Sequence, residues 1–151
     1  MKFFTRAWAR GEMANAEAAA VPDVYWRYVA TLNLPTSVAA LSQVNPHDAL
    51  VLGVEHQPEL LRLTLRLRCG DLQRGYSDIT LAFSQVVVDG VTLDTLKHAM
   101  RPARVEVLYD EVDRSDERFE YRLLLDPVGE VRIRFQQVEI TTRPVSNREA
   151  G

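Results

Sequence analysis

One strand pattern occurs twice in this sequence, with the same irregularity at the end of each copy. Apolar and polar residues alternate over residues 79–84 and again over residues 131–136, and the last apolar residue of each run is a phenylalanine, Phe83 or Phe135. A polar pair follows each phenylalanine, and the apolar phase then moves by one residue. Because such a shift turns side chains to the opposite face of a sheet, the pattern predicts an extra residue, a β-bulge, at the end of each strand.

Two further runs complete each copy. Alternating leucines over residues 61–67 match the apolar positions of residues 119–125. A first strand is predicted at about residues 49–54 in one copy and about 105–112 in the other. Each copy is therefore predicted to be a three-stranded antiparallel meander. Since alternation is the commonest strand pattern, two unrelated meanders remain the alternative to a pseudo-symmetric pair.

Helices are predicted before the first meander and between the two meanders. Their ranges are 5–9, 22–32, 35–44 and 92–100, with 15–20 as an optional extra turn. Pro22 suits the first position of a helix because it has no backbone N–H to satisfy. The apolar residues that follow it recur at the spacing of one helix face, which requires a sheet to cover. Thr92 is expected to cap the connecting helix.

These elements predict an α+β protein. We expect the N-terminal helices to pack on one face of an antiparallel sheet of about six strands, with the two meanders joined by a short helix. The other face would be more exposed. A chain of 151 residues, 46% apolar and 26% charged, suffices for one domain with a core. This domain is expected to span residues 1–143, and residues 144–151 are expected to form a flexible polar tail.

The sequence has no feature of a secreted or membrane protein. Its N-terminus lacks the long apolar run of a secretory signal, and no stretch approaches the roughly 18 apolar residues that span a membrane. We therefore expect a cytoplasmic location. Cys69 is the only cysteine, so no intrachain disulfide can form, and its apolar strand phase predicts a small core residue. Trp8 and Trp26 are expected to be core anchors rather than walls of a ligand pocket.

The basic residues are almost all arginine, 16 of 18, in a chain of net charge −3. Six arginines occupy the polar phase of predicted strands: Arg62, Arg66, Arg68, Arg122, Arg132 and Arg134. They could pair across strands with the carboxylates of Glu106, Asp110, Glu120 and Glu130. Alternatively, they form a face that recognises an anionic protein, because arginine is favoured at interfaces. Nucleic acid is not an expected partner, since the chain is acidic overall.

Candidate catalytic or metal-binding residues are few. His47 and Asp48 precede the first strand and could act as a base and its orienting group in a small hydrolase. No serine or cysteine nucleophile motif accompanies them, and Asp48 also suits a turn. His56 and His98 lack the spacing of metal ligands. The acidic residues of 110–117 lack the glycine of a calcium-binding loop and are expected to be solvated hairpin charges. No metal site or cofactor is predicted.

Several short stretches spread over the chain carry a resemblance to known proteins. They are the opening MKFFT, Trp8, Tyr25-Trp26, His47-Asp48-Ala49, residues 70–76 and residues 108–112. In these the chain resembles a family of uncharacterised bacterial proteins of similar length that begin Met-Lys-Phe-Phe-Thr. The resemblance implies no known activity, cofactor or catalytic residue. Helices followed by antiparallel meanders are also similar to small immunity proteins that neutralise bacterial toxins.

The favoured functional interpretation is a non-catalytic protein-binding module of the immunity-protein kind. Its arginine-bearing face or a sheet edge would engage a protein partner. Two alternatives stay open, namely a small hydrolase that uses His47 and Asp48, and a homodimer that buries a sheet edge.

Overall fold

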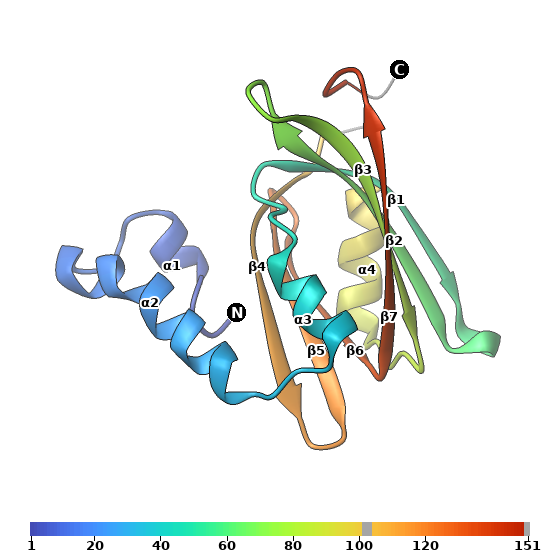
Figure 1. Ribbon diagram of the computed structural model, residues 1–151, viewed down its shortest axis with the longest axis horizontal. Helices are drawn as coiled ribbons and strands as arrows, with labels where there is room; N and C mark the ends of the chain where they lie inside the picture. Colours follow the sequence, from blue (N-terminus) through green and yellow to red (C-terminus); the bar gives the residue numbers. More distant parts are fainter. Residues whose placement is uncertain (101–103, 150–151) are drawn as a thin grey trace.

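The computed structural model describes residues 1–100 and 104–149, and these form an α+β fold with one seven-stranded antiparallel sheet (Figure 1). The helices are α1 (Arg6–Ala9), α2 (Asn15–Thr31), α3 (Thr36–Gln43) and α4 (Gly90–Ala99), with a short 3₁₀ helix, η1, at Pro58–Leu60. The strands are β1 (Ala49–Gln57), β2 (Arg62–Asp71), β3 (Gly75–Ser84), β4 (Glu106–Ser115), β5 (Arg118–Asp126), β6 (Gly129–Phe135) and β7 (Gln137–Val145). The α+β class predicted from the sequence is confirmed.

The sheet has one strand more than the expected six, in the order β6-β5-β4-β1-β2-β3-β7. Both predicted meanders are present, as β1–β3 and β4–β6. The additional strand arises because the chain after Phe135 continues as β7 instead of ending in a bulge. Beyond β7, Arg148 donates hydrogen bonds to the Asp48 carbonyl and the Glu106 carboxylate, both at 2.9 Å. Residues 150 and 151 of the expected C-terminal tail lie outside the described residues.

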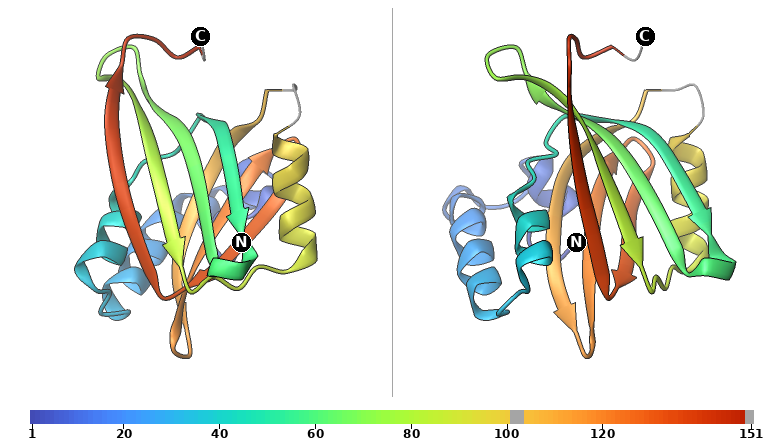
Figure 2. Two further views of the ribbon diagram at one scale, coloured as in Figure 1. Left: turned by 90° about the vertical axis from the view of Figure 1, so that its right-hand side faces the viewer. Right: turned by 45° about the vertical axis from the view of Figure 1, so that its right-hand side comes forward.

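The sheet folds back on itself because its middle is weakly joined. β1 pairs with β4 through Ala49 and Leu50 only, so the two halves of the sheet diverge beyond these residues. The halves then face each other (Figure 2). Phe83 of β3 lies 4.9 Å from Phe135 of β6 and 5.9 Å from Tyr121 of β5, measured between ring centroids. The core therefore lies between the two half-sheets, while α3 packs against β7 and β4 and α4 packs against β6 and β1.

The segment that follows each meander pairs with the last strand of the other meander. The chain that continues from β6 becomes β7 and pairs with β3. The chain that continues from β3 forms a single bridge between Val87 and Arg134 of β6 before α4 begins. The first strand of each meander also has a register shift near its start, between Val51 and Gly53 in β1 and between Val107 and Tyr109 in β4. These correspondences support the pseudo-symmetric pair over two unrelated meanders.

The helix boundaries differ from the predicted ones in two places. α2 begins seven residues before Pro22, which lies inside the helix and not at its first position. In α2 only Tyr25 is buried. Trp26 is exposed, so the prediction that Trp26 is a core anchor is wrong. α4 is capped by Asp89, whose carboxylate accepts the backbone N–H of Thr92 at 2.7 Å. Thr92 is instead a buried residue within the helix.

Replacing Gly70 by alanine is expected to lower the free energy of unfolding by about 2 kcal/mol. Gly70 has a φ of +119°, and a Cβ there would lie 2.0 Å from the Gly75 carbonyl oxygen. Gly75 is the matched control, because its φ is +84° but a Cβ would meet nothing within 4 Å. Its replacement by alanine is expected to cost about 1 kcal/mol from backbone strain alone. Urea unfolding would measure the free energy of unfolding of both variants. An equal decrease in the two would contradict the steric argument.

Candidate functional site

His47 and Asp48 lie together in the turn between α3 and β1. The Nε2 atom of His47 is 3.5 Å from a carboxylate oxygen of Asp48, and its Nδ1 atom is 2.6 Å from the Leu108 carbonyl oxygen. The ring also stacks on Tyr109 at 4.9 Å between centroids. Since a carbonyl can only accept, Nδ1 carries a hydrogen in this arrangement. The lone pair of a neutral ring then lies on Nε2, as a base would require.

These two residues line a cavity of about 410 Å³ at one end of the molecule, with Cys69, Ser77 and Thr142 among the other lining residues. Within the described residues, no hydrogen bond joins His47 to the hydroxyl of Ser77 or Thr142. Burial raises the pKa of the Cys69 thiol to about 12, so this sulfur is not a thiolate near neutral pH. His47 and Asp48 are therefore close together, but Asp48 lies at the ring nitrogen that carries the lone pair and the Leu108 carbonyl takes the orienting position, so the predicted base and orienter pair is not formed and no activated nucleophile accompanies it in the described residues.

The predicted hairpin acids are mostly not solvated. β4 extends to Ser115, so three of them lie within the strand and only Asp116 and Glu117 lie at the turn. Glu111 and Asp113 are buried. The prediction is wrong for Glu111 and Asp113 because the first residues of the chain and Arg122 cover them. In residues 1–100 and 104–149, no group of three or more His, Cys, Asp or Glu is placed to hold a metal ion, and His56 and His98 belong to none.

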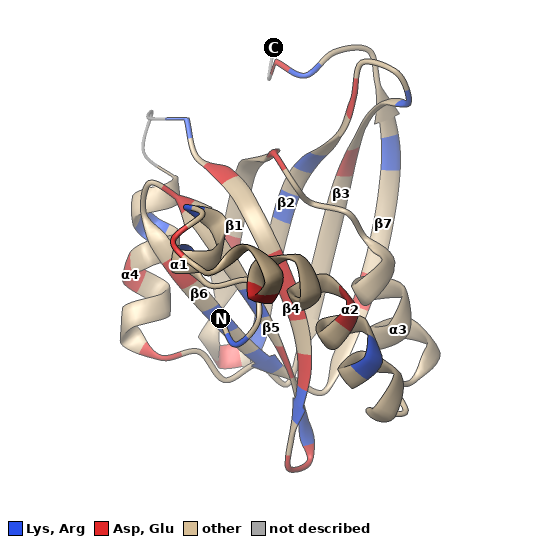
Figure 3. Ribbon diagram, turned by 90° about the vertical axis from the view of Figure 1, so that its left-hand side faces the viewer, with Lys and Arg blue, Asp and Glu red and all other residues tan. Residues whose placement is uncertain are grey.

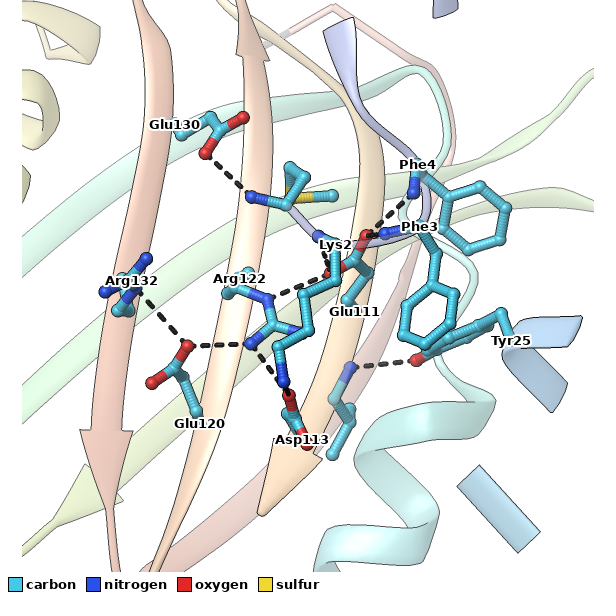
Figure 4. A network of polar contacts seen from close by, with 12 residues as sticks. Lys2, Phe3, Phe4, Tyr25, Glu111, Asp113, Glu120, Arg122, Glu130 and Arg132 are labelled. Atoms are coloured by element: carbon cyan, nitrogen blue, oxygen red, sulfur yellow. Dashed lines mark hydrogen bonds and ion pairs between the residues drawn. The ribbon is translucent and has the colours of Figure 1, made fainter. Parts of the chain in front are cut away.

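A buried ionic cluster forms on the outer face of β4 and β5 (Figure 4). The Arg122 guanidinium donates from Nε to Glu111 at 2.9 Å and from Nη1 to Asp113 at 3.0 Å and to Glu120 at 2.8 Å. Its Nη2 atom has no hydrogen-bond partner in the described part of the chain. Burial lowers the pKa of Arg122, but the hydrogen bonds and charges of these acids outweigh it and raise the pKa above its ordinary value.

The cluster holds the N-terminal segment on the sheet. The Glu111 carboxylate accepts the backbone N–H groups of Lys2, Phe3 and Phe4 at 2.9, 2.7 and 2.7 Å. The Lys2 ammonium donates to Asp113 at 2.7 Å. This docking role was not predicted from the sequence. Its signal was present, because acids and an arginine occupy the same polar phase of two strands that pair as a hairpin.

The six candidate arginines do not share one face. Arg62, Arg66 and Arg68 lie on the outer face of β2, Arg122 is buried under the N-terminal segment, and Arg132 and Arg134 lie on β6. Figure 3 shows acidic and basic residues side by side on β4, β5 and β6. Glu120 pairs with Arg132 and Arg134 at 3.3 and 3.2 Å, as well as with Arg122. Asp110, another predicted partner, is partly buried and instead accepts the Tyr121 hydroxyl at 3.1 Å.

The outer face of β1, β2, β3 and β7 has no helix over it in the part of the chain that the structure describes (Figure 2, left). We call it the open face. Its residues are Gly53, Glu55 and Gln57 on β1, Arg62, Thr64, Arg66 and Arg68 on β2, Asp78, Thr80, Ala82 and Ser84 on β3, and Gln137, Glu139, Thr141 and Arg143 on β7. A hollow of about 640 Å³ lies over its short side chains, bordered by Glu55, Arg62 and Glu139 and, from the start of α3, by Ser37.

Two arginines of the open face lack an ionic partner. Arg68 forms a 2.7 Å ion pair with Asp78. Arg62 and Arg66 form no ion pair with any other described residue. The guanidinium of Arg66 lies over the backbone of Gly53, where a Cβ would come within 2.8 Å of its Nη2 atom. Arg62 and Arg66 therefore lie on the open face without a direct ion pair, although the charge of Arg66 helps to lower the pKa of Asp78.

Within the described residues, no helix is both long and apolar enough to cross a membrane. Comparisons of the chain with protein-family models, curated proteins and solved structures found no match. The resemblance to bacterial proteins beginning Met-Lys-Phe-Phe-Thr therefore stays a prediction.

Proposed function

We propose that this protein is a non-catalytic protein-binding module of the immunity-protein kind and that it binds its partner through the open face. The observation that carries the proposal is a bare four-stranded surface with two arginines, Arg62 and Arg66, that lack ion-pair partners within the described residues. A guanidinium without an internal partner can bind a carboxylate on another protein without first breaking a pair.

The shape of the open face fits a protein better than a small molecule. Bare faces are ordinary in antiparallel sheets, so exposure alone does not indicate binding. Here the centre consists of short side chains such as Thr64, Ala82 and Thr80, while charged residues stand around it. Arginine is enriched at protein interfaces, and Arg62 and Arg66 supply it on this surface.

Other surfaces give the alternatives less support. The cavity beside His47 and Asp48 supplies no activated nucleophile for hydrolysis. The two strands at the ends of the sheet order are β6 and β7, and each is contacted by another segment. α4 and the Val87 bridge lie against β6, and α3 lies against β7. Strand addition by a second copy would need a free edge such as the part of β1 that diverges from β4 beyond Leu50, whereas binding through the open face needs no free edge.

Charge reversal of the open face is expected to abolish partner binding. Wild-type protein purified from its native host should recover a stoichiometric protein partner. The double variant Arg62→Glu, Arg66→Glu should recover less of that partner by about tenfold or more, because repulsion replaces charge pairing. The matched control is Arg10→Glu, Arg27→Glu, which changes the same charge at exposed positions on or beside α1 and α2. Quantitative mass spectrometry of the eluates gives the ratios, and equal recovery by both variants would overturn the proposal.

A further inference from the structure

Most of β1 has a strand partner on one side only. On that side it pairs with β2 from Leu50 to Gln57. On the other side it pairs with β4 at Ala49 and Leu50, and one further hydrogen bond runs from the Val51 N–H to the Val105 carbonyl at 3.1 Å. From Leu52 onward, no strand in the described part of the chain pairs with this side. We call residues 52–57 the free edge, and such an edge accepts a strand from another chain.

The helix nearest to the free edge lies on its core side. α4 contacts β1, and its buried residues Leu96 and Ala99 belong to the core between the two half-sheets. The helix therefore approaches β1 from the face that also carries Val54, which is only partly buried. The opposite face of β1 belongs to the open face, where no described helix lies (Figure 2, left).

Two opposite charges meet the free edge on the open face. Glu55 is exposed, and its carboxylate accepts a hydrogen bond from the Gln57 amide at 2.9 Å but forms no ion pair with another described residue. Arg66 is the β2 partner of Gly53, and its guanidinium lies over that glycine. Because Gly53 has no side chain, the guanidinium extends across β1 toward the free edge. A positive and a negative group thus stand two residues apart along this edge.

This pair of charges is complementary to itself under a two-fold rotation. When two β1 strands pair antiparallel with Val54 opposite Val54, Gly53 of each copy lies directly opposite Glu55 of the other. Directly opposed residues point to the same face, with Cβ atoms about 4.5–5.5 Å apart. Each Glu55 carboxylate then meets the Arg66 guanidinium that lies over the opposing Gly53. The rotation forms this ion pair twice and brings the two Val54 side chains together on the core side.

We infer that this protein forms a two-fold dimer through the free edge of β1, with a second copy of the chain as the occupant. The dimer continues β1, β2, β3 and β7 of both copies as one sheet. Both open faces lie on the same side of that sheet, because opposed residues share a face. An interface of this symmetry closes on itself and does not propagate into fibres. The inference goes beyond the proposed function and does not depend on it, although Arg66 takes part in both.

Other occupants and registers fit the free edge less well. Centring the pair on Glu55 sets two carboxylates directly opposite each other, and centring it on Gly53 sets two Arg66 guanidinium groups together. Like charges in such positions disfavour pairing. A strand of a different protein would need an acidic residue opposite Gly53 and a basic group opposite Glu55. A second copy centred on Val54 supplies both groups.

Charge reversal and charge exchange test the dimer in the purified protein. Sedimentation equilibrium at about 1–100 µM should show the wild type approaching twice the 17.1 kDa mass of one chain. Glu55→Arg and Arg66→Glu should each weaken dimerisation by about tenfold or more, because each sets like charges opposite one another. The double variant Glu55→Arg, Arg66→Glu should restore the dimer. Glu139→Arg is the matched control, since it makes the same charge change at an exposed position of the open face on β7.

A disulfide across the two-fold axis tests the register. Val54→Cys should form an intermolecular disulfide under mild oxidation, because opposed residues of an antiparallel pair have Cα atoms about 4.5–5.5 Å apart. The wild type, whose only cysteine is the buried Cys69, should remain without a crosslink. A monomer at every concentration, a dimer that neither charge reversal weakens, or a double variant that fails to restore dimerisation would overturn the inference.

Arg62 separates this inference from the proposed function. It lies four residues from Arg66 on β2, away from the paired segment, so Arg62→Glu alone should leave the dimer intact. If the wild type is monomeric but still recovers a partner that the Arg62→Glu, Arg66→Glu variant loses, the dimer is wrong and the proposed function stands. If the wild type dimerises with the expected charge dependence and recovers no partner, the proposed function is wrong and the dimer stands.

Discussion

Replacing Arg122 by methionine is expected to lower the free energy of unfolding by about 3–5 kcal/mol. The methionine fills a similar volume but leaves three carboxylates, Glu111, Asp113 and Glu120, without the cation between them. All three are buried, and Glu111 is fully inaccessible to solvent. A buried charge that loses its partner keeps the cost of leaving water and loses the compensating attraction. Equilibrium unfolding in guanidinium chloride, followed by circular dichroism, would measure the loss.

Arg132 provides the matched control for this experiment. It pairs with the same Glu120 at 3.3 Å, but its side chain is 47% exposed. Because exposed ion pairs contribute little, Arg132→Met is expected to cost less than about 1 kcal/mol. Similar losses from both variants would show that the cluster is not effectively desolvated. Hydrogen exchange gives a second measurement, since the amides of Lys2, Phe3 and Phe4 should lose protection in Arg122→Met as the position of Glu111 loosens.

Stability is expected to fall as the pH rises from about 4 to about 7, because of Asp110. Burial raises the pKa of this carboxyl from 3.8 to about 7, although the Tyr121 hydroxyl donates to it at 3.1 Å. The folded state therefore keeps the proton to a higher pH than the unfolded chain does. The resulting stabilisation is complete below the unfolded pKa and is lost as the pH rises through the folded pKa, and it amounts to roughly 2–4 kcal/mol.

The variant Asp110→Asn should flatten the stability profile across that pH range, because the amide does not titrate. Unfolding in urea at a series of pH values would give both profiles. Asp113 is the control, since hydrogen bonds from Lys2 and Tyr28 outweigh its burial and lower its pKa to about 2. Its stabilisation is present above the ordinary carboxyl pKa and is lost as the pH falls toward 2. Asp113→Asn should therefore leave the slope between pH 4 and 7 intact, and a wild-type profile that is flat there would refute the role of Asp110.

The strands could be predicted from the sequence because alternation of apolar and polar residues is a local pattern. Alternation over a few residues places Leu63, Leu65 and Leu67 on one face of β2, and all three are buried in the structure. The end of β4 was misjudged for the same reason. Its polar positions include Glu111 and Asp113, and in the sequence these acids resemble the charged residues of a solvated turn. In the structure the N-terminal segment and Arg122 cover them. Burial of a charged residue depends on partners distant in the chain, so a local pattern does not reveal it.

The candidate sites depended still more on distant contacts. His47 and Asp48 are neighbours in the chain, so their proximity could be anticipated, whereas the missing nucleophile could not. The arginines of β2 and β6 shared one predicted face because both strands show the same alternation. In the structure β2 and β6 belong to different halves of the folded sheet, so their arginines do not form one surface.

The sequence by itself determined the α+β class, the doubled meander and the helices between and before its strands. Each of these follows from side-chain spacing within one segment, where the period of a strand or helix decides which residues can be buried together. Only the tertiary structure decided that the sheet folds on itself at the short β1–β4 contact. It also decided that the segment after each meander pairs with the other meander. It also decided which charges are buried and which surface stays open. The reason is physical, because strand order and the burial of charge are set by contacts between segments far apart in the chain, which no local period encodes.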